Sequence, residues 1–255
     1  MRLTKHHALG NDFLVLLDPE GELDAGEAMA RALCDRHRGI GADGLVHAGP
    51  GRGGADVSML LRNADGGRAE MSGNGARCLG QAVAMSRGVE DLNLAVATDA
   101  GVRRVAVRAG EDQRTVWGSV DMGPAKLRGA EQPPAARAAE VDIGNPHLVL
   151  LSPEGPPDAE LEAAGRSRPD LNVEVVWPGP RHDSISMRVW ERGVGETLAC
   201  GTGACAAALA AREWGLTGPS VTVHMPGGDV EVELGDTVTL SGPSVYVATV
   251  EVPWP

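Results

Sequence analysis

The chain of 255 residues repeats itself, and this repeat limits its fold more than any other feature. Three pairs of segments match in the same order: GNDFLVLLD from Gly10 with GNPHLVLLS from Gly144, SGNGARC from Ser72 with CGTGACA from Cys200, and LAVATDAGVRRVAV from Leu94 with VTVHMPGGDVEVEL from Val221. The partners are separated by about half the chain. Because duplication makes matched residues spatial equivalents, the sequence predicts two lobes with the same topology.

Each lobe is expected to combine several short strands with few helices. Runs such as FLVLL, VSMLL, LNLAVA, HLVLL, ISMRVW, VTVHM and VTL are typical of strands. Ala-rich helices are predicted over 73–86, closing at Gly88, and over 201–214, closing at Gly215. Both carry little charge, which favours burial. The expected fold class is α+β, with two pseudo-symmetric lobes, each a mostly antiparallel mixed sheet wrapped around a central buried helix.

The boundaries of the lobes follow from the same repeat. We expect an N-terminal lobe over 1–121 and a C-terminal lobe over 122–255, and we allow for the last strand crossing to the N-terminal lobe. The Pro- and Ala-rich stretch 123–139 is interpreted as the connection between them.

Two local patterns in the first lobe complete the expected fold. A first helix is predicted to open at Asp24, with Glu27 completing a capping box, and to stop near Gly39. RGIGADG, residues 38–44, is interpreted as a tight connection, with a role in shaping a site as the lesser alternative.

Charge and hydropathy favour a small soluble molecule as the partner. The net charge of -12 disfavours nucleic acid and anionic membranes, because phosphates require clustered Lys and Arg. No stretch approaches the roughly 20 apolar residues of a membrane span, and the start MRLTKHHALGND lacks the apolar region of a signal peptide. We therefore expect a cytoplasmic protein that binds neither nucleic acid nor membrane.

No cofactor or metal is expected. Pyridoxal chemistry needs a Schiff-base lysine, and neither Lys5 nor Lys126 lies in a recognisable cofactor setting. The cysteines at 34, 78, 200 and 205 show no CxxC pairing and no His spacing suited to zinc.

The repeated SGNG and CGTG motifs place Ser72 and Cys200 at the starts of the two buried helices. Free N–H groups and the helix dipole collect there, which offers an anion site and is expected to lower a thiol pKa from about 8.5 towards neutrality. Ser72 alone is most simply a helix cap, and Cys200 alone a small core residue. Duplication favours function for the pair. We expect both helices to point at one cleft, where two opposed groups could remove the α-proton of an amino acid from one face and return a proton to the other.

These residues resemble the diaminopimelate epimerase family over nearly the whole chain. The agreement is in LGNDF at Leu9, DRHRGIGADG at Asp35, RNADG at Arg62, SGNGARC at Ser72, GNPH at Gly144, LNVEVV at Leu171, ERGVGETLACGTGACA at Glu191 and MPGGDVEV at Met225. The resemblance implies cofactor-free interconversion of LL- and meso-diaminopimelate by two cysteines, in lysine and peptidoglycan synthesis, and a homodimer.

The resemblance also implies a role for each matching residue. Cys200 matches a catalytic cysteine, and His147 and Glu191 match residues that tune the catalytic thiols. The positions matching the cradle of the reacting carboxylate are Gly73, Asn74, Gly201 and Thr202. The positions matching other substrate contacts are Asn11, Asn63, Asn145, Asn172 and Arg192, of which the arginine suits the distal carboxylate.

The sequence departs from the family at Ser72, where the pattern has its first catalytic cysteine. Cys78 is no substitute, because it falls inside the helix and is expected in the core. A hydroxyl ionises far less readily than a thiol. Three interpretations stay open: an introduced inactivating substitution, a natural variant working through serine or water, or a relative with another reaction. Our hypothesis is that Cys200 is the competent base and Ser72 marks the opposing face.

Other functions compete with diaminopimelate epimerisation. One is a racemase or a one-base enzyme acting on another amino acid, and a less favoured one is a non-catalytic amino-acid-binding protein. Arg192, Asn63 and Asn172 together favour a substrate with two zwitterionic ends, and retention of Cys200 with Glu191 opposes a binding relic.

Overall fold

A computed structural model describes residues 1–69, 71–131, 138–153, 155 and 158–254, and the chain divides into two compact units. The first unit contains residues 1–120 and 242–255, and the second contains residues 121–241. The segment after residue 241 thus returns to the first unit, the crossing that the sequence analysis allowed for. In the described part of the chain, no helix is both long and apolar enough to cross a membrane.

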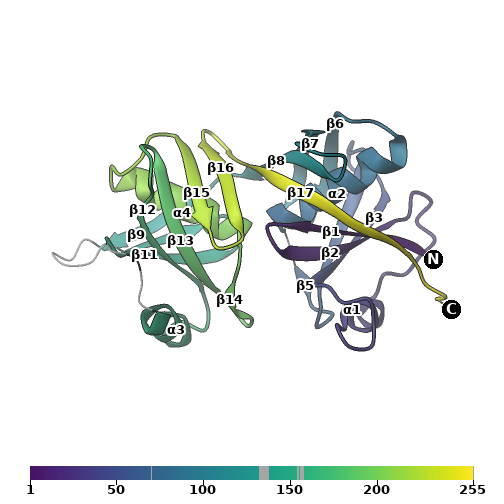
Figure 1. Cartoon of the computed structure of the whole chain (residues 1–255), viewed down its shortest axis with the longest axis horizontal. Coiled ribbons are helices and arrows are strands. Elements are labelled where there is room, and N and C mark those ends of the chain that lie inside the picture. The colour runs from purple at the N-terminus through teal and green to yellow at the C-terminus, as the bar shows by residue number, and fades with distance from the viewer. Residues whose placement is uncertain (70, 132–137, 154, 156–157, 255) are drawn as a thin grey trace. The chain divides into compact units, whose positions relative to one another are not determined.

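From β1 in the first unit and from β10 in the second, the two units use the same succession of elements, and β9 precedes it in the second (Figure 1). The first has β1 (Arg2–Ala8), β2 (Asn11–Leu17), α1 (Glu27–Cys34), β3 (Gly44–Pro50), β4 (Val57–Asn63), β5 (Arg68–Ala69), α2 (Gly73–Arg87), β6 (Leu92–Thr98), β7 (Gly101–Ala109) and β8 (Thr115–Gly123). The second has β9 (Lys126–Glu131), β10 (Ala138–Asp142), β11 (Pro146–Leu151), α3 (Asp158–Ser167), β12 (Asn172–Pro178), β13 (Ser184–Glu191), β14 (Gly195–Thr197), α4 (Gly201–Glu213), β15 (Ser220–Met225), β16 (Gly228–Leu234) and β17 (Val238–Glu251).

Strand pairing repeats in the two units. The chain connects the parallel pair β2–β3 through α1 and the parallel pair β4–β6 through α2. It connects β11–β12 through α3 and β13–β15 through α4 in the same way. The other strand pairs described within each unit are antiparallel, and parallel neighbours require such crossovers. The predicted α+β class and the shared topology are confirmed.

The last strand belongs to both sheets. Residues 238–241 of β17 pair with β16, and residues 245–251 pair with β1. Because β8 also pairs with β17, the strands of the first unit close into a barrel. The second unit has an equivalent pairing. There β9 pairs with β10, just as the end of β17 pairs with β1 in the first unit.

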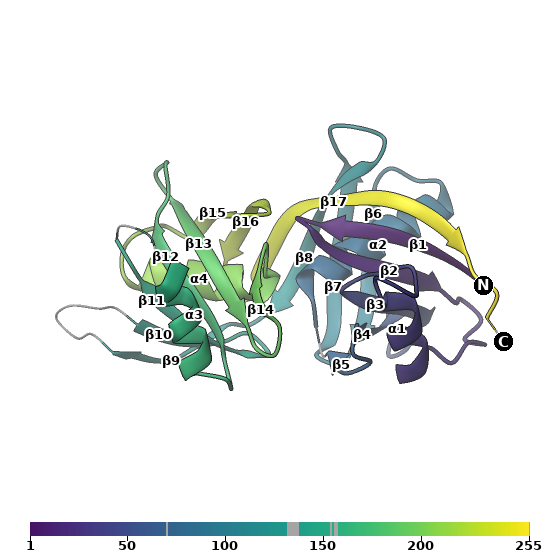
Figure 2. The same cartoon turned by 60° about the horizontal axis from the view of Figure 1, so that its bottom comes forward.

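Each unit encloses one helix. Residues 73–84 of α2 are buried, as are nearly all residues of α4 from Gly201 to Ala211. Figure 2 shows α2 among the strands of its unit, whereas the shorter α1 lies outside them. Gly88 ends α2 in the left-handed conformation with φ +65°, and Gly215 follows α4 with φ +73°. The two helices predicted from the repeat are confirmed almost to the residue.

The first helix differs from the prediction. It starts at Glu27 after Gly26, with no side-chain cap, so the capping box proposed for Asp24 and Glu27 is wrong. It ends at Cys34, five residues before Gly39. The cause is Asp35. Its carboxylate accepts the backbone N–H groups of His37 and Arg38, at 2.8 and 2.9 Å, and thereby competes with the helix.

The stretch 123–139 is not simply a connection. Residues 126–131 form β9 and pair with β10, so they belong to the sheet of the second unit. Residues 132–137, which include two of the three prolines of this stretch, lie outside the described residues. The predicted connection 38–44 is tight as expected: the N–H groups of Ile40 and Gly41 both donate to the Leu33 carbonyl, at 2.9 and 3.0 Å.

The close fit of α2 against its sheet gives a testable prediction. A Cβ added at Gly80 would lie 2.9 Å from the Cγ1 atoms of Val105 and of Val107 on β7. Although alanine favours helix by about 1 kcal/mol over glycine, we expect Gly80→Ala to destabilise the protein by about 1–3 kcal/mol through overpacking. The measurement is urea unfolding, with Met85→Ala on the exposed side of the same helix as the control. Equal midpoints for both variants would contradict the tight packing.

Candidate active site

The repeated motifs begin the two enclosed helices in the same way. Ser72 is the N-cap of α2, and its hydroxyl accepts the Gly75 N–H at 3.0 Å. Cys200 is the N-cap of α4, and its sulfur accepts the Gly203 N–H at 3.4 Å. Both caps have extended backbone, with φ of -140° and -125°. The helix-start positions predicted for both side chains are confirmed.

In the first unit, two predicted substrate residues are hydrogen-bonded to each other. The amide nitrogen of Asn74 donates to the Asn11 side-chain oxygen at 3.1 Å, and the Asn11 amide nitrogen donates to Asp43 at 2.8 Å. The Asn74 oxygen accepts from the fully buried guanidinium of Arg77. This series of hydrogen bonds fixes the orientation of both amides. Asp43, at the end of the tight connection, is a site residue that sequence reasoning missed.

Asn63 is not joined to this pair. It ends β4 opposite Gly44 and is exposed, and among the described residues its side chain makes no hydrogen bond to Asn11 or Asn74. Gly73, the other predicted residue here, is buried in the first turn of α2.

In the second unit, four predicted residues form a continuous hydrogen-bonded series. His147 Nε2 lies 3.1 Å from the Asn145 side-chain oxygen, and the Asn145 amide nitrogen donates to the Thr202 hydroxyl at 3.3 Å. The Thr202 hydroxyl lies 3.4 Å from the Cys200 sulfur. The sequence placed these residues in one site by resemblance, and the fold of this unit brings them together.

Two carboxylates accompany the thiol. Glu191 accepts a hydrogen bond from the Thr197 hydroxyl, and its charge raises the pKa of the Cys200 thiol. Glu174, fully buried on β12, accepts from His147 Nδ1 at 2.7 Å. Sequence reasoning missed Glu174, although a lone acidic residue within the apolar run NVEVVW was a signal for it.

The lowered thiol pKa expected for Cys200 is wrong. Burial raises the pKa of the Cys200 thiol well above its ordinary value, and the charges of Glu191 and Glu174 raise it further. Hydrogen bonds from Thr202 and the Gly203 N–H oppose this shift but are outweighed. Burial likewise raises the pKa of Glu191, and the nearby Glu174 adds to the effect. The helix N-terminus therefore lies in an environment that keeps the thiol protonated.

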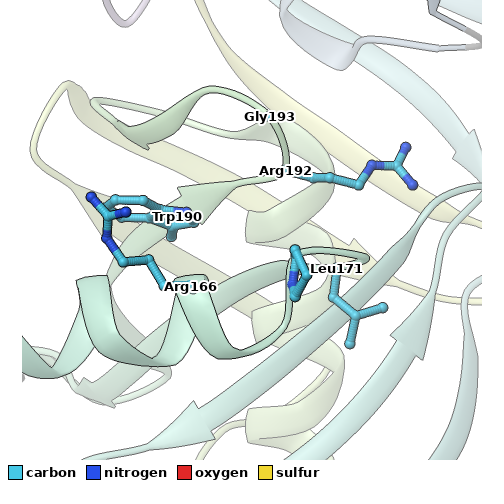
Figure 3. Close-up of a pocket in the computed structure, with 7 residues that line it drawn as sticks. Arg166, Leu171, Trp190, Arg192 and Gly193 are labelled. Atoms are coloured by element: carbon cyan, nitrogen blue, oxygen red, sulfur yellow. The ribbon is translucent and has the colours of Figure 1, made fainter.

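Arg192 follows β13 in a turn held by Asn172, whose side-chain oxygen accepts the Arg192 backbone N–H at 2.9 Å. The turn borders a pocket lined also by residues of α3 and by Trp190. Figure 3 shows the Arg192 side chain extending away from Arg166, which stacks on the Trp190 ring at 5.8 Å. Arg192 is exposed, so its guanidinium is open to a ligand anion.

Cys78 behaves as the sequence predicted. It is fully buried inside α2, and burial raises the pKa of its thiol to about 12. It cannot replace a thiol at position 72.

Solved structures define the class of protein to which this fold belongs. A hydroxyproline epimerase from Agrobacterium vitis superimposes with a TM-score of 0.72 at 15% identity, covering 99% of this chain and 90% of its own. A phenazine biosynthesis protein of the PhzF family from Bacillus anthracis gives a TM-score of 0.74 at 14% identity, covering 100% and 99%. At such identities the likeness shows the fold alone.

Sequence comparison gives the family. The diaminopimelate epimerase family model matches residues 3–128 and 140–247, so the chain belongs to the diaminopimelate epimerase family. The diaminopimelate epimerase of Corynebacterium glutamicum ATCC 13032 is 42% identical, covering 98% of this chain and 97% of its own. That of Synechococcus elongatus is 36% identical, covering 97% and 96%.

The charges around Cys200 give the second prediction. Replacing Glu191 by Gln removes a negative charge that disfavours the thiolate, so the thiol pKa falls and the thiolate fraction near neutral pH rises. We expect alkylation of Cys200 by iodoacetamide to become about tenfold faster. Peptide mapping by mass spectrometry measures it, with Glu196→Gln as the control, because Glu196 is paired with Arg188 at 2.6 Å instead. An unchanged rate in the Glu191 variant would show that burial alone sets the pKa.

Proposed function

We propose that this chain is an isomerase that interconverts LL- and meso-diaminopimelate in lysine and peptidoglycan synthesis. Family membership and relatives of that name over nearly the full length support the substrate. The observation that carries the chemistry is Cys200, which begins a buried helix beside Glu191 and ends the hydrogen-bonded series from His147. A thiol, a carboxylate and an imidazole within one unit are suited to moving a proton.

The helix starts are proposed to hold the reacting carboxylate. The first N–H groups of a helix have no intrahelical acceptor, and the dipole favours an anion there. We assign this role to the backbone of Gly73 and Asn74 in α2 and of Gly201 and Thr202 in α4. Charge that grows on the carboxylate as the α-proton leaves is stabilised by the same groups. This arrangement requires Ser72 and Cys200 to lie on opposite faces of the α-carbon.

Cys200 is proposed to exchange its proton with the α-carbon. Because burial and the nearby carboxylates keep the thiol protonated, it must first transfer its proton to act as a base. Glu191 can take it, since its own pKa is raised. The resulting thiolate removes the α-proton, breaking the C–H bond and leaving the electron pair on the substrate, and a proton delivered to the opposite face by Ser72 or by water forms the new C–H bond. In the reverse sense the thiol returns a proton to that face.

The proposal includes the finer features implied by the family resemblance. We propose a homodimer in the cytoplasm that works without pyridoxal phosphate. In support, all four cysteines are free, as a reducing compartment maintains. Lys5 is engaged by Asp12 at 2.9 Å and by the Gly41 carbonyl at 2.6 Å, so it already has partners of its own.

Restoring the missing thiol tests the function. We expect Ser72→Cys to raise kcat/KM for LL-diaminopimelate epimerisation by about a hundredfold, because a positioned acid or base contributes about 10²- to 10⁴-fold. Ser72→Ala, which removes the hydroxyl and the cap together, serves as the control and should not exceed the present chain. The assay follows loss of the LL isomer.

Hydrogen exchange at the α-carbon adds a readout that distinguishes the two faces. In deuterium oxide, the present chain should exchange the α-proton of one isomer much faster than that of the other, and Ser72→Cys should exchange both. Equal exchange from both isomers in the present chain would refute the assignment of Cys200 as the competent base.

The distal end of the substrate tests its identity. Arg192→Met removes an open guanidinium, and a lost charge-assisted contact with a carboxylate lowers kcat/KM for diaminopimelate by about 10- to 100-fold. Arg166→Met, a change of the same kind in the same pocket, is the control and should leave turnover unchanged. Turnover insensitive to Arg192→Met would favour a racemase for another amino acid.

A further inference from the structure

Glu174 is a fully buried carboxylate whose presence the fold does not require. It lies in β12 among buried valines, and its Oε2 has no hydrogen-bond partner among the described residues. Burying such a group is costly unless it is paired, and its partner is His147, also fully buried. A carboxylate buried at this cost is a candidate for a functional role.

The duplicated unit shows that the same position can be apolar. Phe13 lies opposite Gly44 in β2–β3, and His147 lies opposite Asn172 in β11–β12. Because Asn11 corresponds to Asn145, Phe13 corresponds to His147, and Val46 therefore corresponds to Glu174. The unit that contains Ser72 thus folds with a phenylalanine and a valine where the unit that contains Cys200 has an imidazole and a carboxylate.

The hydrogen bonds from this pair run towards the thiol. The Asn145 amide nitrogen donates to Thr202, so the Asn145 oxygen is an acceptor and His147 must donate to it through Nε2. The Thr202 hydroxyl, having accepted from Asn145, has its own proton left for the Cys200 sulfur at 3.4 Å. Once the thiol ionises its sulfur can only accept, so Thr202 is then the donor.

In the first unit the corresponding bonds run the other way. Asn74 donates to Asn11, and Asn11 donates to Asp43, so the series leads away from the start of α2. The group at the far end sets this direction, because a carboxylate can only accept whereas His147 donates. The group that keeps His147 a donor at Nε2 therefore determines whether the Cys200 sulfur receives a hydrogen bond from Thr202.

We propose that Glu174 is a positioning residue for Cys200: by accepting from Nδ1 it holds the His147 ring with both nitrogens as donors, so that Nε2–H stays directed at Asn145 and Thr202 presents a hydrogen bond to the sulfur. This inference rests on the proposed function, in which Cys200 moves the substrate proton. The hydrogen bond from Thr202 stabilises the thiolate and offsets part of the burial that disfavours it. The close packing agrees, since a Cβ on Gly203 would lie 2.6 Å from Glu174 Oε1.

A matched pair of variants isolates this role. Glu174→Gln and Glu174→Val both remove the carboxylate, but only the glutamine leaves Nδ1 a hydrogen-bond partner that holds the ring with Nε2–H on Asn145, whereas in the valine variant the ring is free to turn. In the present chain, we expect the pH midpoint for Cys200 alkylation to be about one unit higher in the valine variant than in the glutamine variant. In the Ser72→Cys background, we expect kcat to be about tenfold lower for valine than for glutamine, with KM within about threefold.

Controls separate positioning from folding. Urea unfolding should show both variants folded and the valine variant the less stable of the two, because His147 loses its buried partner, and Val176→Ala on the same strand should leave the alkylation midpoint unchanged. Indistinguishable midpoints for the glutamine and valine variants, or a KM that changes as much as kcat, would overturn the proposal. If the valine variant does not fold, Thr202→Val should raise the midpoint by about one unit and Thr202→Ser should not; equal midpoints there would overturn it.

The alkylation midpoint and the turnover of diaminopimelate test the two proposals independently. The alkylation midpoint is independent of any substrate, so a difference between the two variants supports the positioning role even where neither the present chain nor Ser72→Cys turns over diaminopimelate. Absence of turnover in both chains would refute the proposed function alone. Turnover without a difference in midpoint would remove the role of Glu174 and leave the function intact.

Discussion

The structure depends on burying a helix start in each unit. The first turns of α2 and α4 are lined by glycine and small polar residues, and both are enclosed with backbone N–H groups that have no acceptor in the helix. Ser72 and Cys200 each satisfy one of these groups. The groups that remain make the enclosed end attractive to an anion, and the same burial that creates this site disfavours charge on the thiol beside it.

One topology thus carries two different electrostatic environments. Near Cys200 the second unit has His147, Glu174 and Glu191, and the corresponding positions of the first unit, by strand register, are Phe13, Val46 and Asn63. The fold tolerates either set, so the ionisable set is explained by chemistry more readily than by stability. A two-faced proton transfer needs one group that accepts a proton and one that donates it, and divergence of these three positions gives the two helix starts different electrostatic surroundings.

The repeat made much of this predictable from sequence. Both enclosed helices and their caps followed from SGNGARC and CGTGACA, because nearly charge-free Ala-rich segments after a capping residue have few alternatives. Strand 126–131 was missed because only its pairing with β10 identifies it. The thiol pKa was misjudged because the helix dipole can be inferred from sequence, whereas burial and the charge of Glu174 arise from residues far apart in the chain.

The different charges at the two helix starts bear on the effect of a serine at position 72. In the first unit the buried guanidinium of Arg77 donates to Asn74 in the opening turn of α2, which places a positive charge at this helix start. In the second unit the charges of Glu191 and Glu174 raise the thiol pKa. A thiol ionises more readily beside a cation than beside carboxylates. Serine therefore removes the ionisable group from the unit with the buried cation, and Cys200 remains in the unit where Glu191 must first take its proton.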